Sequence, residues 1–225
     1  MTLIEVAVVV AVVILLFALL LWPALSKMRD HDRRIRCVNN LKQVGLAARL
    51  WERDHGDKFP MSISKDNGGS MEFITGPNTF RHFQIMSNQL STPSILICPT
   101  ESDRGRARAT NFTAFDNSNL SYFVGVDATE SNANAIFSGD HNITNGLPIK
   151  NGILELPPNQ LAGWTAKMHD RSGIVVLADG SVQMVGTSGL RSVIAAPSLM
   201  MTGSDTYVTN SAPFTNRLQM PVLTP

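Results

Sequence analysis

Two groups of residues in the second half of the chain carry side chains that could do chemistry. His169 is followed, after nine residues, by Asp179-Gly180, and a histidine with a carboxylate invites a catalytic or metal-binding interpretation. Asp-Gly between two apolar runs is, however, first of all a hairpin turn, and a histidine at a strand start can form a local hydrogen bond. We therefore expect His169, Asp179 and Gly180 to form a structural hairpin.

The second group consists of the carboxylates Asp127, Glu130 and Asp140, which lie in a polar stretch after a predicted strand at 120–126. Carboxylate oxygens are ligands that suit Ca²⁺. The regular D-x-D-x-D-G loop is absent, and carboxylates in loops are usually solvated. Calcium at these three residues and plain solvated carboxylates are thus the two alternatives, and no other cofactor is expected.

Signatures of common enzyme classes are absent from the sequence. It has no G-x-S-x-G, P-loop, H-E-x-x-H or C-x-x-C motif, and its five histidines are scattered. We therefore expect no catalytic residue and no enzymatic activity. The net charge is only +1, so no strong electrostatic field indicates a nucleic-acid partner. Arg104, Arg106 and Arg108 would share one face of a strand, and we expect this small basic cluster to be a solvated face and not a nucleic-acid-binding surface.

The first segment of the chain is almost entirely apolar. In Leu3 to Leu21, eighteen of nineteen residues are apolar and Glu5 is the exception. About 20 apolar residues in a helix span a bilayer core. A carboxylate inside a bilayer costs about 3 kcal/mol, which indicates that Glu5 has a partner. The α-amino group of Met1 on a neighbouring copy could neutralise it, and this would make Glu5 an assembly residue.

Here the sequence resembles the type IV pilins and the pseudopilins of type II secretion. Met1-Thr2-Leu3-Ile4-Glu5-Val6 is similar to the start of a mature subunit after cleavage by prepilin peptidase, and Glu5 matches the family's fifth-position glutamate. The resemblance implies an N-methylated Met1. It also implies a helix kink near Pro23, which lacks an amide hydrogen. Phenylalanine is commoner than methionine at the first position of the family.

The helix is expected to continue beyond Pro23. The apolar positions Ile35, Val38, Leu41, Val44, Ala48 and Trp51 recur at spacings of three to four residues, which is typical of an amphipathic helix. Gly56 is a plausible C-cap and Pro60 a stop. After Gly56, short apolar runs at 94–98, 120–126 and 173–177 predict strands. Asn-Gly and Asp-Gly steps between such runs predict turns.

The head carries a second resemblance. Cys37 to Leu46 is similar to the "CxNNLKQxGLA" helix of a pilin-like family abundant in planctomycete and verrucomicrobial bacteria, and His169 with Asp179-Gly180 matches that family's H-X9-DG signature. In an exported head, Cys37 and Cys98 could form a disulfide, the alternative being two buried thiols. Pseudopilins as a family bind calcium in a head loop, so the resemblance implies that Asp127, Glu130 and Asp140 are candidate calcium ligands.

We thus expect an α+β chain, a long helix packed on a mainly antiparallel β head in the ladle shape of pilins. The expected parts are a membrane and filament-core helix (1–26), its amphipathic second half (27–56), a β-rich head (57–185) and a Ser/Thr/Pro-containing extension (186–225). The expected function is a structural subunit, the major pilin of a helical homopolymer.

Its expected partners are prepilin peptidase and the assembly machinery. The expected location is the inner membrane and then the cell surface. The alternatives are a periplasmic pseudopilus subunit and a single-pass membrane protein with a binding or enzymatic head. Asn111, Asn119 and Asn142 lie in N-x-S/T triplets, and glycosylation is left open.

Overall fold

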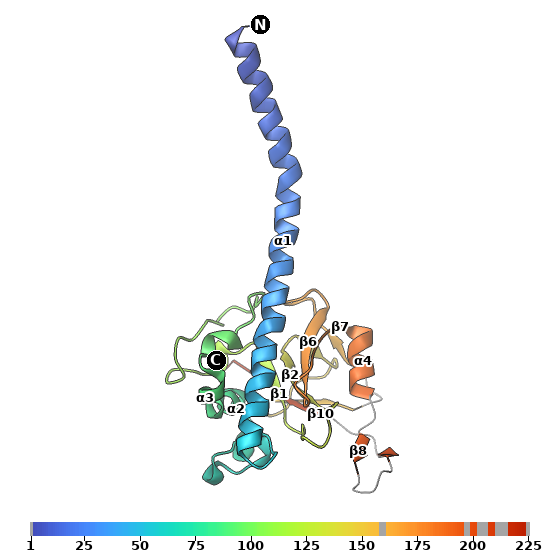
Figure 1. Ribbon diagram of the computed structural model, residues 1–225. Helices are drawn as coiled ribbons and strands as arrows, with labels where there is room; N and C mark the ends of the chain where they lie inside the picture. Colours follow the sequence, from blue (N-terminus) through green and yellow to red (C-terminus); the bar gives the residue numbers. More distant parts are fainter. Residues whose placement is uncertain (1, 158–160, 196–198, 202–206, 210–215, 224–225) are drawn as a thin grey trace.

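The chain folds into one long helix attached to an α+β head (Figure 1). The computed structural model describes residues 2–157, 161–195, 199–201, 207–209 and 216–223, and at 20–27, 199–201 and 207–209 it describes the backbone alone. Helix α1 (Leu3–Asp54) has 52 residues, and its first half projects freely from the head. The expected α+β class is therefore confirmed.

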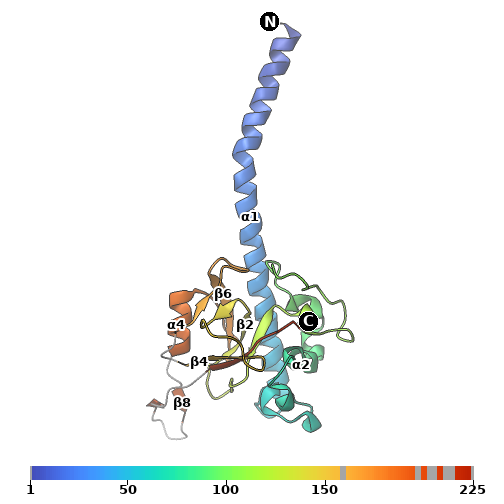
Figure 2. The same cartoon turned by 180° about the vertical axis from the view of Figure 1, so that it is seen from behind.

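Both ends of α1 are defined by local chemistry. Thr2 is the N-cap, and its side chain accepts a hydrogen bond from the backbone of Glu5. At the other end Gly56 has φ +68°, the left-handed conformation that commonly ends a helix. A kink was expected near Pro23, but the backbone stays helical through this residue and the helix is not interrupted there. The free half of α1 instead curves gently (Figures 1 and 2).

The second half of α1 contributes one face to the core. Leu41, Val44, Ala48 and Trp51 are buried as expected, and Cys37 extends this stripe at its N-terminal end. Ile35, in contrast, is 45% exposed, because it lies before the point where the helix enters the head. The amphipathic interpretation is therefore confirmed from Cys37 onward and wrong at Ile35.

The head is built on a six-stranded, fully antiparallel sheet of order β4-β10-β1-β2-β6-β7. Its strands are β1 (Tyr122–Gly125), β2 (Ile136–Asp140), β4 (Ile153–Leu156), β6 (Ser172–Leu177), β7 (Val182–Gly186) and β10 (Asn216–Gln219). Two small pairs join β3 (Ile143–Thr144) to β5 (Gly163–Trp164) and β8 (Leu199–Met201) to β9 (Tyr207–Thr209). The described residues also form the helices α2 (Thr79–Ile85), α3 (Ser87–Leu90) and α4 (Thr187–Ala195) and the 3₁₀ turns η1 (Pro60–Ser62), η2 (Lys65–Asn67), η3 (Met71–Phe73), η4 (Pro93–Leu96) and η5 (Asn117–Asn119).

Alternation along the strands separates two apolar cores. In β1, Tyr122 and Val124 belong to the core that α1 shares, whereas Phe123 between them belongs to the core on the opposite face. The second core also takes in Leu190 and Ile194 of α4. The sheet is thus covered by α1 on one face and by α4 and the small β3–β5 pair on the other (Figure 1).

Two expectations about the head are wrong. Residues 94–98 do not form a strand, because Pro93 opens the 3₁₀ turn η4 there. The predicted boundary at residue 185 fails as well: β7 continues to Gly186, α4 packs in the second core, and β10 lies between β4 and β1 in the sheet. Helix α4 and strand β10 therefore belong to the head, whereas β8 lies apart from it in Figure 2.

Candidate functional site

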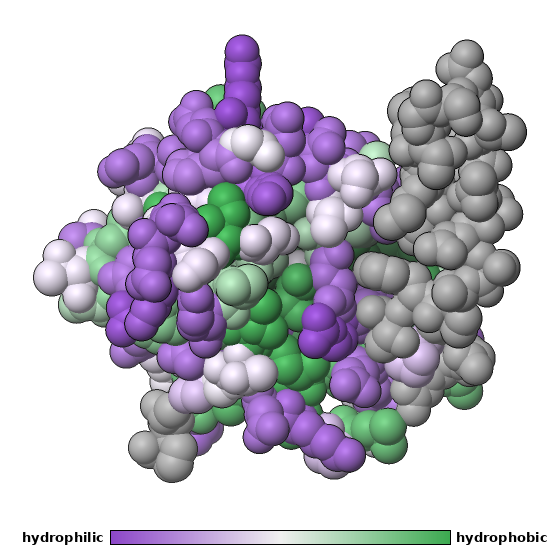
Figure 3. Space-filling view, turned by 90° about the horizontal axis from the view of Figure 1, so that it is seen from below, coloured by the Kyte–Doolittle hydropathy of each residue, from purple (hydrophilic) through white to green (hydrophobic). Residues whose placement is uncertain are grey.

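The free half of α1 exposes a long continuous run of apolar side chains. Every residue from Thr2 to Leu19 is exposed, and nearly all are apolar, with exposed fractions such as 89% at Leu3 and 65% at Leu19. The head seen from below is mostly hydrophilic, with an apolar band across its centre (Figure 3). Soluble monomers seldom expose an apolar surface of this extent, so this part of α1 is a candidate interaction surface. None of the helices, as far as their described residues go, combines the length and apolar character needed to cross a membrane.

Glu5 has a partner within its own chain. Its Oε2 accepts a hydrogen bond from the Thr2 backbone N at 2.9 Å, while the Glu5 backbone N donates to Thr2 Oγ1 at 3.4 Å. Together these bonds form a capping box, which satisfies amides at the helix start. The pattern Thr-x-x-Glu is a capping-box signature that is visible in the sequence. Met1 lies outside the described residues, so the expected contact between its amine and Glu5 remains a prediction.

The disulfide between Cys37 and Cys98 is present, with Cα atoms 5.1 Å apart. It joins the first buried turn of α1 to the loop after η4, and both cysteines are fully buried. Asn40, one turn further along α1, donates a hydrogen bond to the carbonyl of Ile97 at 3.3 Å. The Cys37–Asn40 segment therefore fastens the helix to the head covalently and by hydrogen bonding.

His169 lies in the core beside this disulfide. Its Nε2 is 3.4 Å from Cys98 Sγ and 3.3 Å from Oδ2 of Asp140, and His169 and Asp140 have no exposed surface. Burial lowers the pKa of His169 to about 4 and raises that of Asp140 to about 8. Because the disulfide consumes both thiols and no solvent reaches the pair, this arrangement supports the core and offers no catalytic nucleophile.

Asp179 and Gly180 form the hairpin turn between β6 and β7, as expected. Asp179 Oδ1 accepts a hydrogen bond from the Ser181 backbone N at 2.8 Å, and Gly180 has φ +85°. The six residues of β6 separate this turn from His169, so the structure does not bring the histidine and Asp179 together. The turn instead packs on α1, where a Cβ on Gly45 would lie 3.3 Å from the Gly180 carbonyl oxygen.

The three carboxylates proposed for calcium are not gathered into a site. Asp127 accepts hydrogen bonds from the backbone N and Nε of Arg217, each at 3.0 Å. Asp140 is buried beside His169, and Glu130 lies exposed in the loop after β1. The groups of three potential ligands in the described residues include none of these carboxylates, so the calcium interpretation of this set is wrong.

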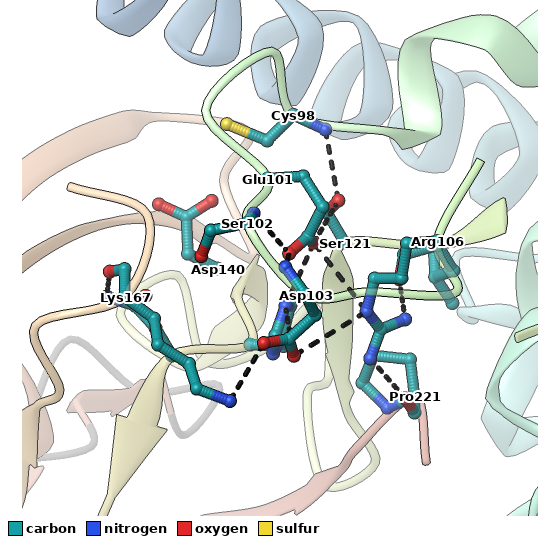
Figure 4. Close-up of polar contacts among 12 residues, drawn as sticks. Cys98, Glu101, Ser102, Asp103, Arg106, Ser121, Asp140, Lys167 and Pro221 are labelled. Atoms are coloured by element: carbon teal, nitrogen blue, oxygen red, sulfur yellow. Dashed lines mark hydrogen bonds and ion pairs between the residues drawn. The ribbon is translucent and has the colours of Figure 1, made fainter. Parts of the chain in front are cut away.

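A different cluster of charged side chains forms at one end of the sheet, where β1 begins and β2 and β10 end. We call it the Glu101 cluster, and its members are Glu101, Asp103, Arg106, His141 and Lys167. In Figure 4 the loop that carries Glu101 and Asp103 lies between Arg106 on one side and Lys167 on the other. Three separate chain segments therefore meet at this cluster.

Glu101 is the centre of the cluster. Its carboxylate accepts hydrogen bonds from His141 Nε2 at 2.9 Å, from the Ser121 hydroxyl at 2.7 Å and from the backbone N of Asp103 at 2.9 Å. Burial alone would raise the pKa of Glu101, but the hydrogen bond and attraction of His141, together with those of Asp103 N and Ser121, lower it to about 2. Glu101 is therefore ionised throughout the physiological range.

Arg106 links the cluster to the end of the chain. Its guanidinium donates hydrogen bonds to the carbonyls of Asn117, Leu120 and Pro221. Its Nε lies 3.6 Å from Glu101 Oε2. Arg104, Arg106 and Arg108 thus do not line one face of a strand, because their segment is a loop and Arg106 points inward.

The sequence carries little signal for the Glu101 cluster, since its members are separated by up to 66 positions and form no motif. Of the three N-x-S/T asparagines, Asn142 is buried and donates three hydrogen bonds to backbone carbonyls, which gives it a structural role.

Comparisons of the chain with protein-family models, with curated proteins and with solved structures found no match.

Proposed function

We propose that this chain is the subunit of a type IV pilus-like filament that assembles through the free half of α1. The observation that carries the proposal is the exposed apolar helix, residues 3–19, on an otherwise well-packed head. Each Val or Leu side chain moved from water into an apolar contact contributes about 1.5–3 kcal/mol. Parallel packing of these helices between copies would bury that surface, and head-to-tail contacts of this kind propagate into a helical filament.

Glu5 is proposed to set the register of assembly. The capping box holds its carboxylate at the very start of α1, beside the backbone of Thr2. In a bundle of staggered helices, the amine of a neighbour's Met1 would approach this carboxylate and neutralise it. The resemblance to pilins supports this role, with cleavage by prepilin peptidase and N-methylation of Met1 as its preconditions.

The disulfide supports an exported head. Disulfides persist outside the reducing cytoplasm, and Cys37–Cys98 joins the helix to the head. The chain would wait in the inner membrane before assembly and then form a filament at the cell surface. A short periplasmic pseudopilus is the second form that the same helix packing could take.

The test is electron microscopy of material sheared from cells, with mass spectrometry of the filament protein. Long fibres composed mainly of this chain and beginning at methylated Met1 support a major pilin. Processed chain confined to the envelope supports the pseudopilus. An unprocessed N-terminus contradicts both and leaves a membrane-anchored head.

Two matched variants separate the role of Glu5 in assembly from its role in capping. Glu5→Gln keeps an acceptor for the Thr2 amide but removes the charge, and it is expected to abolish filaments. Thr2→Ala removes a cap worth about 1 kcal/mol but keeps the carboxylate, and it is expected to leave filaments in place. Filaments that persist in Glu5→Gln would contradict a role for the charge and would leave Glu5 with capping alone.

A further inference from the structure

A cleft of about 320 Å³ opens beside the Glu101 cluster. One wall is polar and carries Asp103, His141 and Lys167, and the other consists of Ile149 and the segment 220–223. Its volume lies at the lower end of the range for small-molecule sites. The cleft belongs to the head and is independent of the proposed packing of α1.

The charges along the polar wall are balanced. Lys167 Nζ lies 2.8 Å from Asp103 Oδ1, and the buried guanidinium of Arg106 faces the carboxylate of Glu101 (Figure 4). A metal ion entering the cleft would meet the cations Lys167 and Arg106, and an anion would meet the carboxylate of Asp103, with the buried Glu101 next to Arg106. Glu101, Asp103 and His141 approach one another closely enough to hold a metal, but this balance argues against one. The wall therefore favours a neutral ligand.

Residues of the cleft also hold polar atoms whose hydrogen-bonding capacity is unused. Arg106 Nε is a donor, Asn142 Oδ1 an acceptor and Thr165 Oγ1 can be either, and all three are buried without a hydrogen-bond partner in the described part of the chain. Unpaired buried polar atoms are uncommon in folded proteins. The side chains that line the cleft therefore include both donors and acceptors.

The opposite wall is apolar and accessible. Ile149 is 43% exposed and Val222 is 37% exposed. A ligand that fills the cleft would place an apolar surface against these side chains and its polar groups against Asp103 and Lys167. A pyranose ring has this division, because hydroxyl groups surround a face of C–H bonds.

We propose that the cleft is a saccharide-binding site. Asp103 accepts a hydrogen bond from one hydroxyl of a vicinal diol, and Lys167 donates to the other. The C–H face of the ring lies on Ile149 and Val222. The exposed Lys167 side chain, 58% accessible, is free to adjust to the ligand.

Saturation-transfer NMR on the full chain tests the proposal, with maltose, lactose and N,N′-diacetylchitobiose as probes. The detergent must carry a zwitterionic headgroup, because glycoside detergents would compete. Saturation transfer to at least one probe is expected, with affinity lowered about tenfold or more in Lys167→Met and in Asp103→Asn, because each loses a charge-assisted hydrogen bond. Lys65→Met and Asp66→Asn are matched controls on an exposed turn elsewhere on the head, and both should bind like the wild type.

Three outcomes overturn the proposal. The first is the absence of transfer to all three saccharides, and the second is equal binding in the cleft variants and the wild type. The third is binding of Zn²⁺ or inorganic phosphate that is tighter than that of any saccharide and is lost in Asp103→Asn or Lys167→Met respectively. Circular dichroism of each variant shows whether the head stays folded, which Lys167→Met is expected to preserve because its side chain is mostly exposed.

Discussion

Nε2 of His169 lies 3.3 Å from Oδ2 of Asp140, and neither side chain has any exposed surface. The same Asp140 oxygen accepts a hydrogen bond from the Ile174 backbone N at 2.8 Å. Burial raises the pKa of Asp140 to about 8 and lowers that of His169 to about 4. At neutral pH both groups are therefore uncharged in the folded chain, which allows a polar pair to lie in the core.

This pair predicts a loss of stability at alkaline pH. Between pH 6.5 and about 8, Asp140 holds a proton when folded and releases it when unfolded, so the unfolded state binds fewer protons and the free energy of unfolding falls as pH rises. The expected loss is roughly 2 kcal/mol over this interval, at about 1.4 kcal/mol per pH unit. Urea unfolding at several pH values measures it, and Asp140→Asn should abolish this slope. The same slope in the variant would contradict the assignment.

At acid pH the direction reverses. His169 and His82 have folded pKa values lowered to about 4 by burial, so below 6.5 their unfolded forms bind protons that the folded forms exclude. Two such groups outweigh the opposite contribution of Asp140, and stability is expected to fall as pH decreases from 6.5 toward 4. His82→Gln, which can keep the hydrogen bonds to Ser70 and Gln219, should make this fall shallower. If the free energy of unfolding of His82→Gln falls as steeply as that of the wild type between pH 6.5 and 4, His82 is not a cause of the acid destabilisation.

The disulfide is expected to be a major source of stability. It closes a segment of 61 residues, for which the chain-entropy model gives about 4 kcal/mol. The double variant Cys37→Ser/Cys98→Ser should lose a similar amount in urea unfolding. Its control is the wild type under a reducing agent, which should approach the double variant. A loss well below 1 kcal/mol would show that the noncovalent contacts of α1 are enough to hold the head.

Elements with a strong local pattern could be predicted from the sequence. The three-to-four spacing from Leu41 to Trp51 predicts the buried face of α1, and Asp179-Gly180 between apolar runs predicts the hairpin. Both depend on neighbours in sequence, for which periodicity and turn preferences are informative. The Cys37–Cys98 pairing came from resemblance and from the expected location of the head.

Features that depend on distant residues could not be predicted in the same way. Residues 94–98 read as a strand because they are apolar, yet Pro93 and contact with α1 favour a 3₁₀ turn. The carboxylates at 127, 130 and 140 are close in sequence but diverge in space, because Asp127 pairs with Arg217 and Asp140 points into the core. The Glu101 cluster is the converse case, in which side chains distant in sequence meet at one end of the sheet.

Gly45 is expected to be intolerant of a side chain although it lies in a helix. In an exposed helix, Gly→Ala stabilises by about 1 kcal/mol. Here a Cβ would lie 2.9 Å from Cγ1 of Val176, a fully buried side chain with little freedom to move. Gly45→Ala should therefore lower the free energy of unfolding, by about 1–2 kcal/mol after the gain in helix propensity. The measurement is urea unfolding.

A second substitution tests whether this contact is the cause. Val176→Ala removes the methyl groups that Gly45→Ala would press against, so the double variant should lose less than the sum of the two single variants. Additive losses would show that the strain lies elsewhere, for example in the approach of Gly180.

Strand β10 is expected to be indispensable for the head, although it comes at the end of the chain. It pairs with β4 through four residues and with β1 on its other side. Removing residues 216–225 would leave β4 without its partner strand and would expose the edge of β1. We expect this truncated chain to lose cooperative unfolding by circular dichroism, whereas removal of residues 224–225 alone should preserve it. A cooperative transition in the longer truncation would show that the sheet closes without β10.

Adjacent substitutions in β10 distinguish packing from charge. Leu218 is fully buried in the second core, and Leu218→Ala should lower the free energy of unfolding by about 2–5 kcal/mol because it removes buried methyl groups and leaves a cavity. Arg217 points to solvent, where its side chain is 47% exposed and pairs with Asp127, so Arg217→Ala should cost at most about 1 kcal/mol. Similar losses in the two variants would show that truncation of any β10 side chain disturbs the backbone pairing of this strand. The predicted difference follows instead from a strand whose one face completes the apolar core and whose other face carries an exposed ion pair.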